Sequence, residues 1–148
     1  MTPRPASTPP EILFVEDNPG DIELVREALT GVAVHVSVVM DGEHALALLL
    51  GKGGERLGPR PDLVLLDLNL PVTEGKEILR EIRRLECTVP VVVFTGSDAE
   101  EDVEEAYRLG ANCYVVKPPD FEQYLSCVRR IVAFWIEIAR FPARTSGA

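Results

Sequence analysis

Five short apolar segments alternate with five helical patterns along this chain, and no other feature constrains its fold as strongly. The apolar segments are Ile12–Val15, Val34–Met40, Leu63–Leu66, Val91–Thr95 and Cys113–Val116. A strand that is mainly apolar is typical of a parallel sheet whose two faces are both covered. The alternation therefore predicts an α/β fold: a doubly wound, five-stranded parallel sheet with five helices, the last of them elongated.

Turn and capping residues mark where the helices begin. Asn18 or Asp21 can cap the first helix, because their side chains accept hydrogen bonds from free backbone N–H groups. Ser97 and Glu100 have the spacing of a capping box and predict the start of the fourth helix. The final helical pattern is the longest and runs from about residue 121 to residue 140.

Length and composition are those of one globular domain. The chain has 148 residues, of which 46% are hydrophobic and 26% are charged, which suits a single core. Residues 1–10 are rich in proline and small polar residues and are expected to form a disordered lead-in. Residues 11–141 would form the domain with its extended last helix, and residues 142–148 a flexible tail. On this division no room remains for a separate output domain.

The same composition argues against several functions and locations. A net charge of −9 without a basic stripe argues against binding DNA. No apolar run reaches the roughly 18 residues of a membrane-spanning helix, and the N-terminus lacks the apolar core of a secretory signal. An odd number of cysteines, Cys87, Cys113 and Cys127, indicates reduced thiols. The expectation is a cytoplasmic protein that contacts neither DNA nor membrane.

Polar residues stand at the ends of four of the apolar segments. Glu16 and Asp17 follow the first, Asp67 follows the third, Thr95 ends the fourth and Lys117 follows the fifth. Because the carboxyl ends of parallel strands meet at one edge of the sheet, these side chains are expected to lie together. Taken singly, each has a plainer interpretation as a turn, cap, strand-end or solvated residue. Their joint occurrence favours a site.

The chemistry of this set is that of an aspartyl phosphate. Three clustered carboxylates repel one another, so a cation is implied, and hard oxygen ligands suit Mg²⁺. Asp67 would attack phosphorus as a nucleophile. Lys117 would offset the developing charge, and Thr95 would donate a hydrogen bond to a phosphoryl oxygen.

The segments that carry these residues resemble the receiver domain of bacterial two-component response regulators. The matching segments are Phe14–Asn18, Leu65–Pro71, Glu74–Gly75, Phe94–Gly96 and Tyr114–Pro118, within residues 11–130. The resemblance implies a flavodoxin/CheY-like fold and a phosphoryl group received by Asp67 from a histidine kinase. It also implies a Lys117–Pro118 peptide bond that is usually cis.

The resemblance further implies which residues bind the metal and which respond to phosphorylation. Asp17 would bind Mg²⁺ directly, Glu16 mainly through water, and Asn69 through its backbone carbonyl. Asp67 would also belong to the metal site. Tyr114 matches the aromatic switch residue, which turns inward as the strand-end threonine moves toward the phosphoryl group.

A narrower resemblance connects the chain with light signalling. Glu16–Asp21, Ala111–Tyr114 and Phe134–Trp135 look like the small single-domain regulators that are paired with bacterial phytochrome histidine kinases. This resemblance implies a phytochrome-type kinase as the phosphoryl donor.

The last helix is more apolar than one core requires. Its apolar residues span roughly 200°, whereas a helix on one core needs a stripe of about 100°. One seam, Leu125, Val128, Val132, Trp135 and Ala139, would face the core. A second seam would remain beside it, formed by Cys127, Ile131, Phe134, Ile138 and Phe141. We expect this second seam to form a homodimer interface; the alternative is that the tail folds back on its own domain.

Two other functions compete with phosphoacceptor signalling. A phosphatase of the haloacid dehalogenase type also uses a strand-end aspartate, a threonine, a lysine and Mg²⁺. In that family the nucleophile lies on the first strand and a second aspartate two positions later acts as the general acid, whereas Asn69 occupies that position here. A degenerate receiver that only binds partners is the other possibility, and the retained Asp67, Asp17, Thr95 and Lys117 argue against it.

Overall fold

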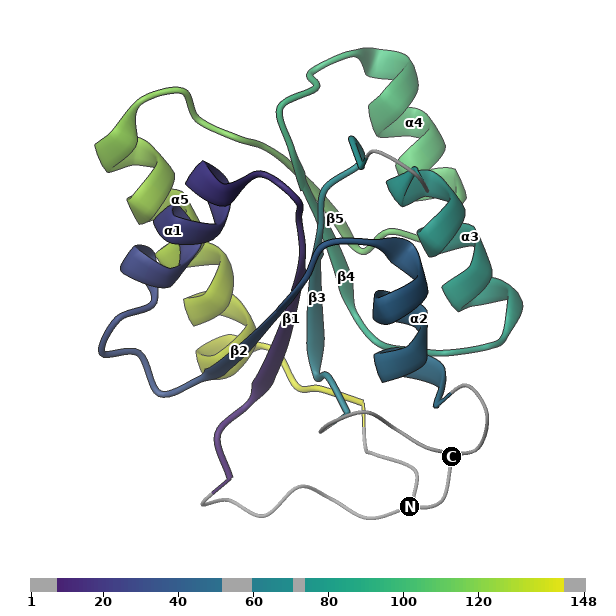
Figure 1. Cartoon of the computed structure of the whole chain (residues 1–148), viewed down its shortest axis with the longest axis horizontal. Helices are drawn as coiled ribbons and strands as arrows, with labels where there is room; N and C mark the ends of the chain where they lie inside the picture. Colours follow the sequence, from purple (N-terminus) through teal and green to yellow (C-terminus); the bar gives the residue numbers. More distant parts are fainter. Residues whose placement is uncertain (1–7, 52–59, 71–73, 143–148) are drawn as a thin grey trace.

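A computed structural model describes residues 8–51, 60–70 and 74–142 of the chain. A single five-stranded sheet lies between two layers of helices (Figure 1). The strands are β1 (Glu11–Val15), β2 (His35–Val39), β3 (Leu63–Leu66), β4 (Val91–Thr95) and β5 (Cys113–Val116). Their order is β2-β1-β3-β4-β5, and every neighbouring pair is parallel. The predicted doubly wound α/β fold is confirmed.

The helices cover both faces of this sheet. They are α1 (Pro19–Ala28), α2 (Gly42–Leu50), α3 (Gly75–Arg84), α4 (Glu100–Arg108) and α5 (Phe121–Ala133), and α5 continues into a π-helical turn, η2 (Phe134–Ile138). Helices α1 and α5 lie on one face, and α2, α3 and α4 lie on the other (Figure 1). This two-sided cover explains why the central strands β1, β3 and β4 are mainly apolar and buried on both faces.

Two apolar cores result, one on each side of the sheet. Successive residues of a strand point to opposite faces, so Ile12 and Phe14 join the core under α1 and α5, whereas Leu13 and Val15 join the core under α2, α3 and α4. All four side chains are fully or almost fully buried. The central strands are thereby fixed in register, and the residues that follow them are held at one edge of the sheet.

Capping follows the sequence prediction at the first helix but not at the fourth. Asn18 caps α1, since its Oδ1 atom accepts a hydrogen bond from the backbone N–H of Asp21 at 3.1 Å. The predicted capping box at Ser97 was wrong, because Ala99 is the N-cap of α4 and makes no side-chain cap hydrogen bond. Ser97 lies two residues before that N-cap, and its hydroxyl donates to Asp102 instead, at 2.5 Å.

The elongated last helix is present, although it ends two residues earlier than expected. Ala139 has an extended backbone after η2, and its N–H donates to the carbonyl of Phe134 at 2.9 Å. Phe141 then stacks on Trp135, with ring centroids 6.3 Å apart, and both rings pack against the core of their own domain. At Phe141 the tail therefore folds back on its own domain, which was the alternative to a dimer contact.

Several expectations fall wholly or partly on residues outside the described ranges. Residues 1–7 and 143–148 are not described, so the disordered lead-in and the flexible tail stay predictions. None of the helices formed by the described residues combines the length and the hydrophobicity that a membrane span requires.

Candidate functional site

The register of β1 and β3 brings the first three carboxylates to one place. Val15 pairs with Leu66, and the backbone N–H of Asp67 donates to the carbonyl of Val15 at 3.1 Å. Glu16 and Asp17 therefore leave β1 beside Asp67. The strand order reverses at β1, so these residues lie next to the switch point where open α/β sheets bind ligands.

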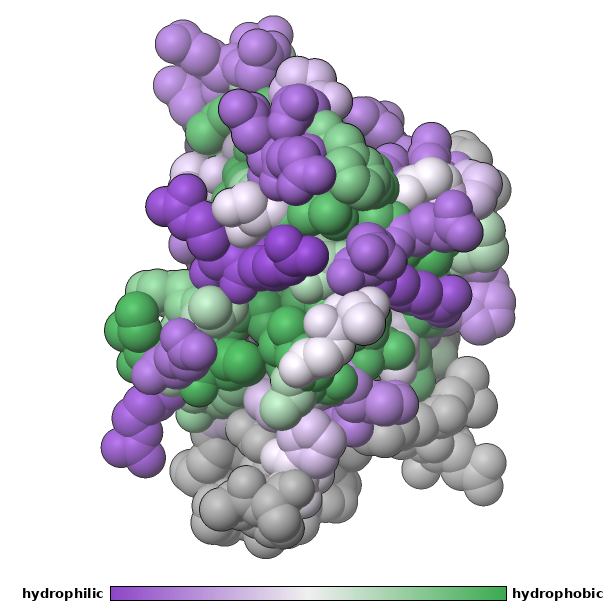
Figure 2. Space-filling view, turned by 90° about the vertical axis from the view of Figure 1, so that its left-hand side faces the viewer, coloured by the Kyte–Doolittle hydropathy of each residue, from purple (hydrophilic) through white to green (hydrophobic). Residues whose placement is uncertain are grey.

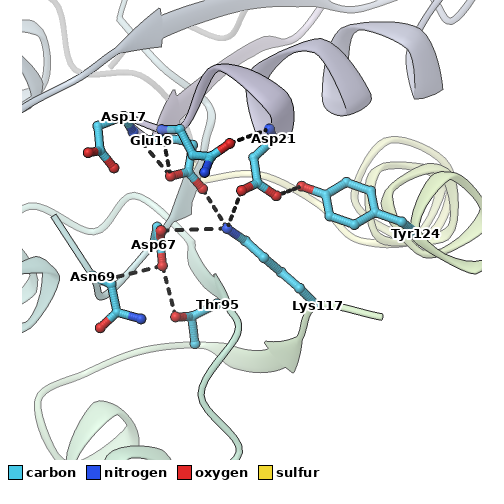
Figure 3. Close-up of polar contacts among 9 residues, drawn as sticks. Glu16, Asp17, Asp21, Asp67, Asn69, Thr95, Lys117 and Tyr124 are labelled. Atoms are coloured by element: carbon cyan, nitrogen blue, oxygen red, sulfur yellow. Dashed lines mark hydrogen bonds and ion pairs between the residues drawn. The ribbon is translucent and has the colours of Figure 1, made fainter. Parts of the chain in front are cut away.

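The fourth strand supplies a hydrogen-bond donor to Asp67. The Thr95 hydroxyl donates to Asp67 Oδ1 at 2.8 Å, and the backbone N–H of Asn69 donates to the same oxygen at 3.2 Å (Figure 3). Thr95 is completely buried and Asp67 is 5% exposed. The carboxylate of Asp67 is thus oriented through Oδ1 and faces the remaining site residues through Oδ2.

Lys117 is the cation on which the carboxylates converge (Figure 3). Its Nζ lies 2.6 Å from Glu16 Oε1, 3.3 Å from Asp21 Oδ2 and 3.5 Å from Asp67 Oδ2. Burial alone would lower the pKa of Lys117, but the hydrogen bond to Glu16 and the three negative charges raise it. Lys117 therefore stays charged.

The peptide bond that follows Lys117 differs from the family expectation. No described residue is joined by a cis peptide bond, so the expected cis Lys117–Pro118 bond was wrong. Trans is the more stable isomer before proline by about 0.5–1 kcal/mol. In the trans chain the backbone N–H of Lys117 still donates to the carbonyl of Thr95, at 2.7 Å.

Glu16 is held by backbone hydrogen bonds as well as by Lys117. Its Oε2 atom accepts hydrogen bonds from the backbone N–H groups of Asp17 and Asn18, at 3.1 and 3.2 Å. The residue is 1% exposed. Burial raises the pKa of Glu16 to about 7, against the lowering effect of Lys117.

A glycine lets α3 approach the site closely. A Cβ atom on Gly75 would lie 2.3 Å from the backbone oxygen of Asp67 and 2.7 Å from the Cα of Leu68. Both are backbone atoms, so the collision could not be relieved by a side chain moving away. The Glu74–Gly75 match noted in the sequence therefore has a steric reason.

The carboxylates fit a divalent cation. Glu16, Asp17 and Asp67 each offer a ligand oxygen, and these atoms all lie within 4.8 Å of one another. Lys117 balances only one of the negative charges, and oxygen donors with free coordination positions are those that Mg²⁺ prefers. The backbone of Asn69 reaches the same place through its hydrogen bond to Asp67.

Tyr114, the aromatic residue of the predicted switch, is hydrogen-bonded to the loop after β4. The Tyr114 hydroxyl donates to the backbone carbonyl of Ser97 at 2.8 Å. The Ser97 hydroxyl in turn bonds Asp102, which pairs with Lys76 at 2.7 Å. Tyr114 and Thr95 are therefore connected by the short segment that leads from β4 into α4.

Two residues of the site were not predicted from the sequence. Asp21 was considered only as a helix cap, yet its carboxylate faces Lys117. Tyr124 belongs to the apolar pattern of the last helix, from which no role in the site follows, yet its hydroxyl donates to Asp21 Oδ1 at 2.6 Å (Figure 3). The sequence feature that could have indicated Tyr124 is its hydroxyl group on an otherwise apolar helix face, because a buried tyrosine hydroxyl usually has a hydrogen-bond partner.

The sequence profile of the response regulator receiver domain matches residues 12–129. The chain belongs to this family. This receiver is 42% identical to the response regulator Rcp1 of Synechocystis sp. over 142 residues, which cover 93% of the chain and 97% of Rcp1. Asp67 follows β3 and not the first strand, where the phosphatases carry their nucleophile, and this also favours the receiver assignment over the phosphatase alternative.

Two solved structures extend the similarity to three dimensions. The phosphorylated cyanobacterial phytochrome response regulator RcpA has a TM-score of 0.85 and 40% identity, with 91% of this receiver and 99% of RcpA covered. The Mn²⁺-bound form of Rcp1 has a TM-score of 0.84 and 40% identity, with 91% and 100% covered. Receivers this similar in sequence and fold are thus known in phosphorylated and metal-bound forms.

The first prediction concerns the metal. We expect Mg²⁺ to raise the melting temperature of the wild type, because a ligand that binds only the native state stabilises it by mass action, by about 2.7 kcal/mol at a hundredfold excess over Kd. Asp17→Ala should remove most of this response in differential scanning calorimetry. The exposed Asp98→Ala should keep the full response. A variant at Asp17 that responds like the wild type would contradict the ligand assignment.

The second prediction concerns pH. Because the pKa of Glu16 is about 7 in the native state and 4.5 is its ordinary value, the native state binds the proton more tightly between these values. Without metal, the free energy of unfolding should therefore fall as pH rises from about 4.5 to about 7, by on the order of 1–3 kcal/mol from this group. Urea unfolding in a chelator should show this slope in the wild type and a shallower one in Glu16→Gln; equal slopes would contradict it.

Proposed function

We propose that Asp67 is the phosphoacceptor of this receiver and that phosphorylation there changes which proteins it contacts. The observation that carries the proposal is the convergence of Thr95, Lys117 and the carboxylate pair on one buried aspartate. Glu16, Asp17, Asp67 and the backbone carbonyl of Asn69 would hold Mg²⁺. When bound, the cation would offset negative charge between the carboxylate and the incoming phosphoryl group.

The transfer itself needs little from the protein beyond position and charge. A carboxylate oxygen of Asp67 forms a bond to phosphorus as the bond from phosphorus to the donor's histidine nitrogen breaks. The leaving imidazole keeps the electron pair and takes up a proton from solvent. Lys117 stays protonated and bonds a phosphoryl oxygen, and the hydroxyl of Thr95 turns from Asp67 Oδ1 to another phosphoryl oxygen.

The response to phosphorylation would pass through the segment after β4. Moving the Thr95 hydroxyl toward the phosphoryl group shifts the backbone that carries Ser97, and the hydrogen bond from Tyr114 to Ser97 transmits that shift to β5. Thr95 and Tyr114 are thus proposed as the switch pair.

Similarity to phytochrome response regulators supports a phytochrome-type histidine kinase, in the cytoplasm, as the donor. We propose no catalysis beyond self-phosphorylation and autodephosphorylation.

The test is a labelling assay with acetyl phosphate as a small donor. Wild-type protein incubated with acetyl phosphate and Mg²⁺ should gain an acid-labile phosphoryl group, seen as a shifted band on a phosphate-affinity gel. Omitting Mg²⁺, or adding a chelator, should remove the band. Steady turnover of small phosphate esters without a labelled protein would instead favour the phosphatase.

We also propose that the receiver forms a homodimer through the C-terminal part of the last helix. Phe134 is 48% exposed and Ile138 is 73% exposed. Phe134 lines a groove of about 1090 Å³ together with Cys127 and Ile131, and Ile138 follows one helical turn later. Figure 2, viewed from the side of α1 and α5, shows hydrophobic surface over the lower part of this face. In a two-fold dimer the protruding residues of each copy would enter the groove of the other.

The dimer gives a further prediction. Phe134→Glu combined with Ile138→Lys should halve the mass measured by light scattering, because each change is felt twice in a two-fold interface. Circular dichroism should be unchanged, since both side chains are exposed. Phe141 stacks on Trp135 of the same chain, so its substitution should affect stability more than association. A wild type that is monomeric at tens of micromolar, with and without phosphorylation, would exclude the dimer.

A further inference from the structure

A hydrogen-bonded chain leads from the proposed phosphorylation site into the last helix. Lys117 Nζ lies 3.3 Å from Asp21 Oδ2, and the other carboxylate oxygen of Asp21 accepts a hydrogen bond of 2.6 Å from the Tyr124 hydroxyl. The three residues come from the β5–α5 connection, α1 and α5, and Figure 3 shows the two contacts that join them through Asp21. Both oxygens of Asp21 are thus directed to different partners.

Tyr124, the member of this hydrogen-bonded series in α5, is held by its packing. Tyr124 is 4% exposed, and its ring packs edge-on against Phe94, with centroids 5.2 Å apart. Burial and the neighbouring charge of Asp21 raise the pKa of Tyr124 well above its ordinary value. The hydroxyl therefore remains a donor, and the acceptor is the carboxylate of Asp21.

At the other end of this series of hydrogen bonds, the side chain of Lys117 is intrinsically flexible. A lysine side chain has four carbons between backbone and ammonium, and its point charge can be placed in many ways. Lys117 is anchored by Glu16 at 2.6 Å, but Glu16 is also a candidate metal ligand. Asp21 lies outside the set of three candidate metal ligands, so it can keep hold of Lys117 when the metal site is filled.

We propose that Asp21 and Tyr124 are positioning residues that hold the Lys117 ammonium at the edge of the phosphoryl site. This inference rests on the proposed function, because Lys117 matters only if Asp67 accepts a phosphoryl group. Tyr124 fixes the carboxylate of Asp21 from one side, and Asp21 restrains Lys117 from the other. The packing of α5 against α1 thereby contributes to the speed of phosphorylation.

The inference predicts slower phosphorylation without loss of the fold. Tyr124→Phe keeps the ring and its contact with Phe94 but removes the hydroxyl; Asp21→Asn keeps the shape but removes the charge. Each should lower the initial rate of labelling by acetyl phosphate by about three- to tenfold, less than the roughly hundredfold that a displacement of 1 Å at a reacting centre can cost. Arg129→Gln is the matched control, because Arg129 donates to the carbonyl of Ala28 and joins the same two helices away from the site.

A spectroscopic readout separates positioning from general weakening. Beryllofluoride on Asp67 would stand in for the phosphoryl group, and the ¹⁹F resonance of the fluorine beside Lys117 should shift in both variants but not in Arg129→Gln. A slower rate with unchanged fluorine spectra would overturn the inference, because the variants would then act elsewhere than at Lys117. Unchanged rates would overturn it as well. If the wild type is not labelled at all, the proposed function fails, and the inference fails with it.

Discussion

Asp67→Asn is expected to abolish labelling by acetyl phosphate, the largest effect on labelling that a single change should have without unfolding the receiver. Asparagine keeps the size of the side chain and an oxygen that can accept the hydrogen bonds from Thr95 and Asn69. Its amide is not a nucleophile, so no bond to phosphorus can form. The expected result on a phosphate-affinity gel is the complete absence of the shifted band.

Stability distinguishes a lost nucleophile from a lost fold. Asp67 lies within 4.8 Å of two other carboxylate ligands, so removing its charge relieves repulsion. The melting temperature of Asp67→Asn without metal should therefore equal or exceed that of the wild type. The exposed Asp98→Asn serves as a control and should be labelled normally. Full labelling of Asp67→Asn would move the acceptor to another residue.

Val132→Glu should unfold the domain or nearly so. Val132 is completely buried in the core under α1 and α5, where an unpaired charge costs about 3–5 kcal/mol. The whole free energy of unfolding of such a domain is about 5–15 kcal/mol. The expected result is a melting temperature lower by on the order of 10 °C, or no cooperative transition at all.

Ile138→Glu is the matched control for this change. Ile138 belongs to the same helical run but is 73% exposed in the single chain, so in the monomer a charge there stays in water. Measured below the dissociation constant of the proposed dimer, its melting temperature should stay close to that of the wild type at the same concentration. If both variants melted alike, the division of the last helix into a buried and an exposed seam would be wrong.

The fold was predictable because its signals are redundant. Each strand is mainly apolar, and each is followed by a helical pattern with its own turn residues, so one architecture satisfies all of them. The limits of β4 and β5 came out as expected. Local capping was less predictable, because α4 begins after Ala99, two residues later than a cap at Ser97 requires. The Ser97 hydroxyl accepts from the N–H of Ala99 at 3.4 Å and donates to Asp102.

The site was predictable only where residues follow strands directly. Asp67, Thr95 and Lys117 could be placed because the register of a parallel sheet determines where strand ends meet. Asp21 and Tyr124 are joined by a contact between two helices 103 residues apart, and helix packing is not encoded by a local pattern. The close approach of Gly75 to Asp67 likewise depends on how α3 docks, which the sequence alone did not reveal.

The most direct test of the central claim is to locate the phosphoryl group in the wild-type protein. Borohydride reduces an aspartyl phosphate to the alcohol, so protein labelled with acetyl phosphate and Mg²⁺ should carry homoserine at one position after reduction. Tandem mass spectrometry should find that position to be Asp67, and the product should be missing when Mg²⁺ is withheld. Reduction at another aspartate, or a labelled protein without any reducible aspartate, would contradict the account.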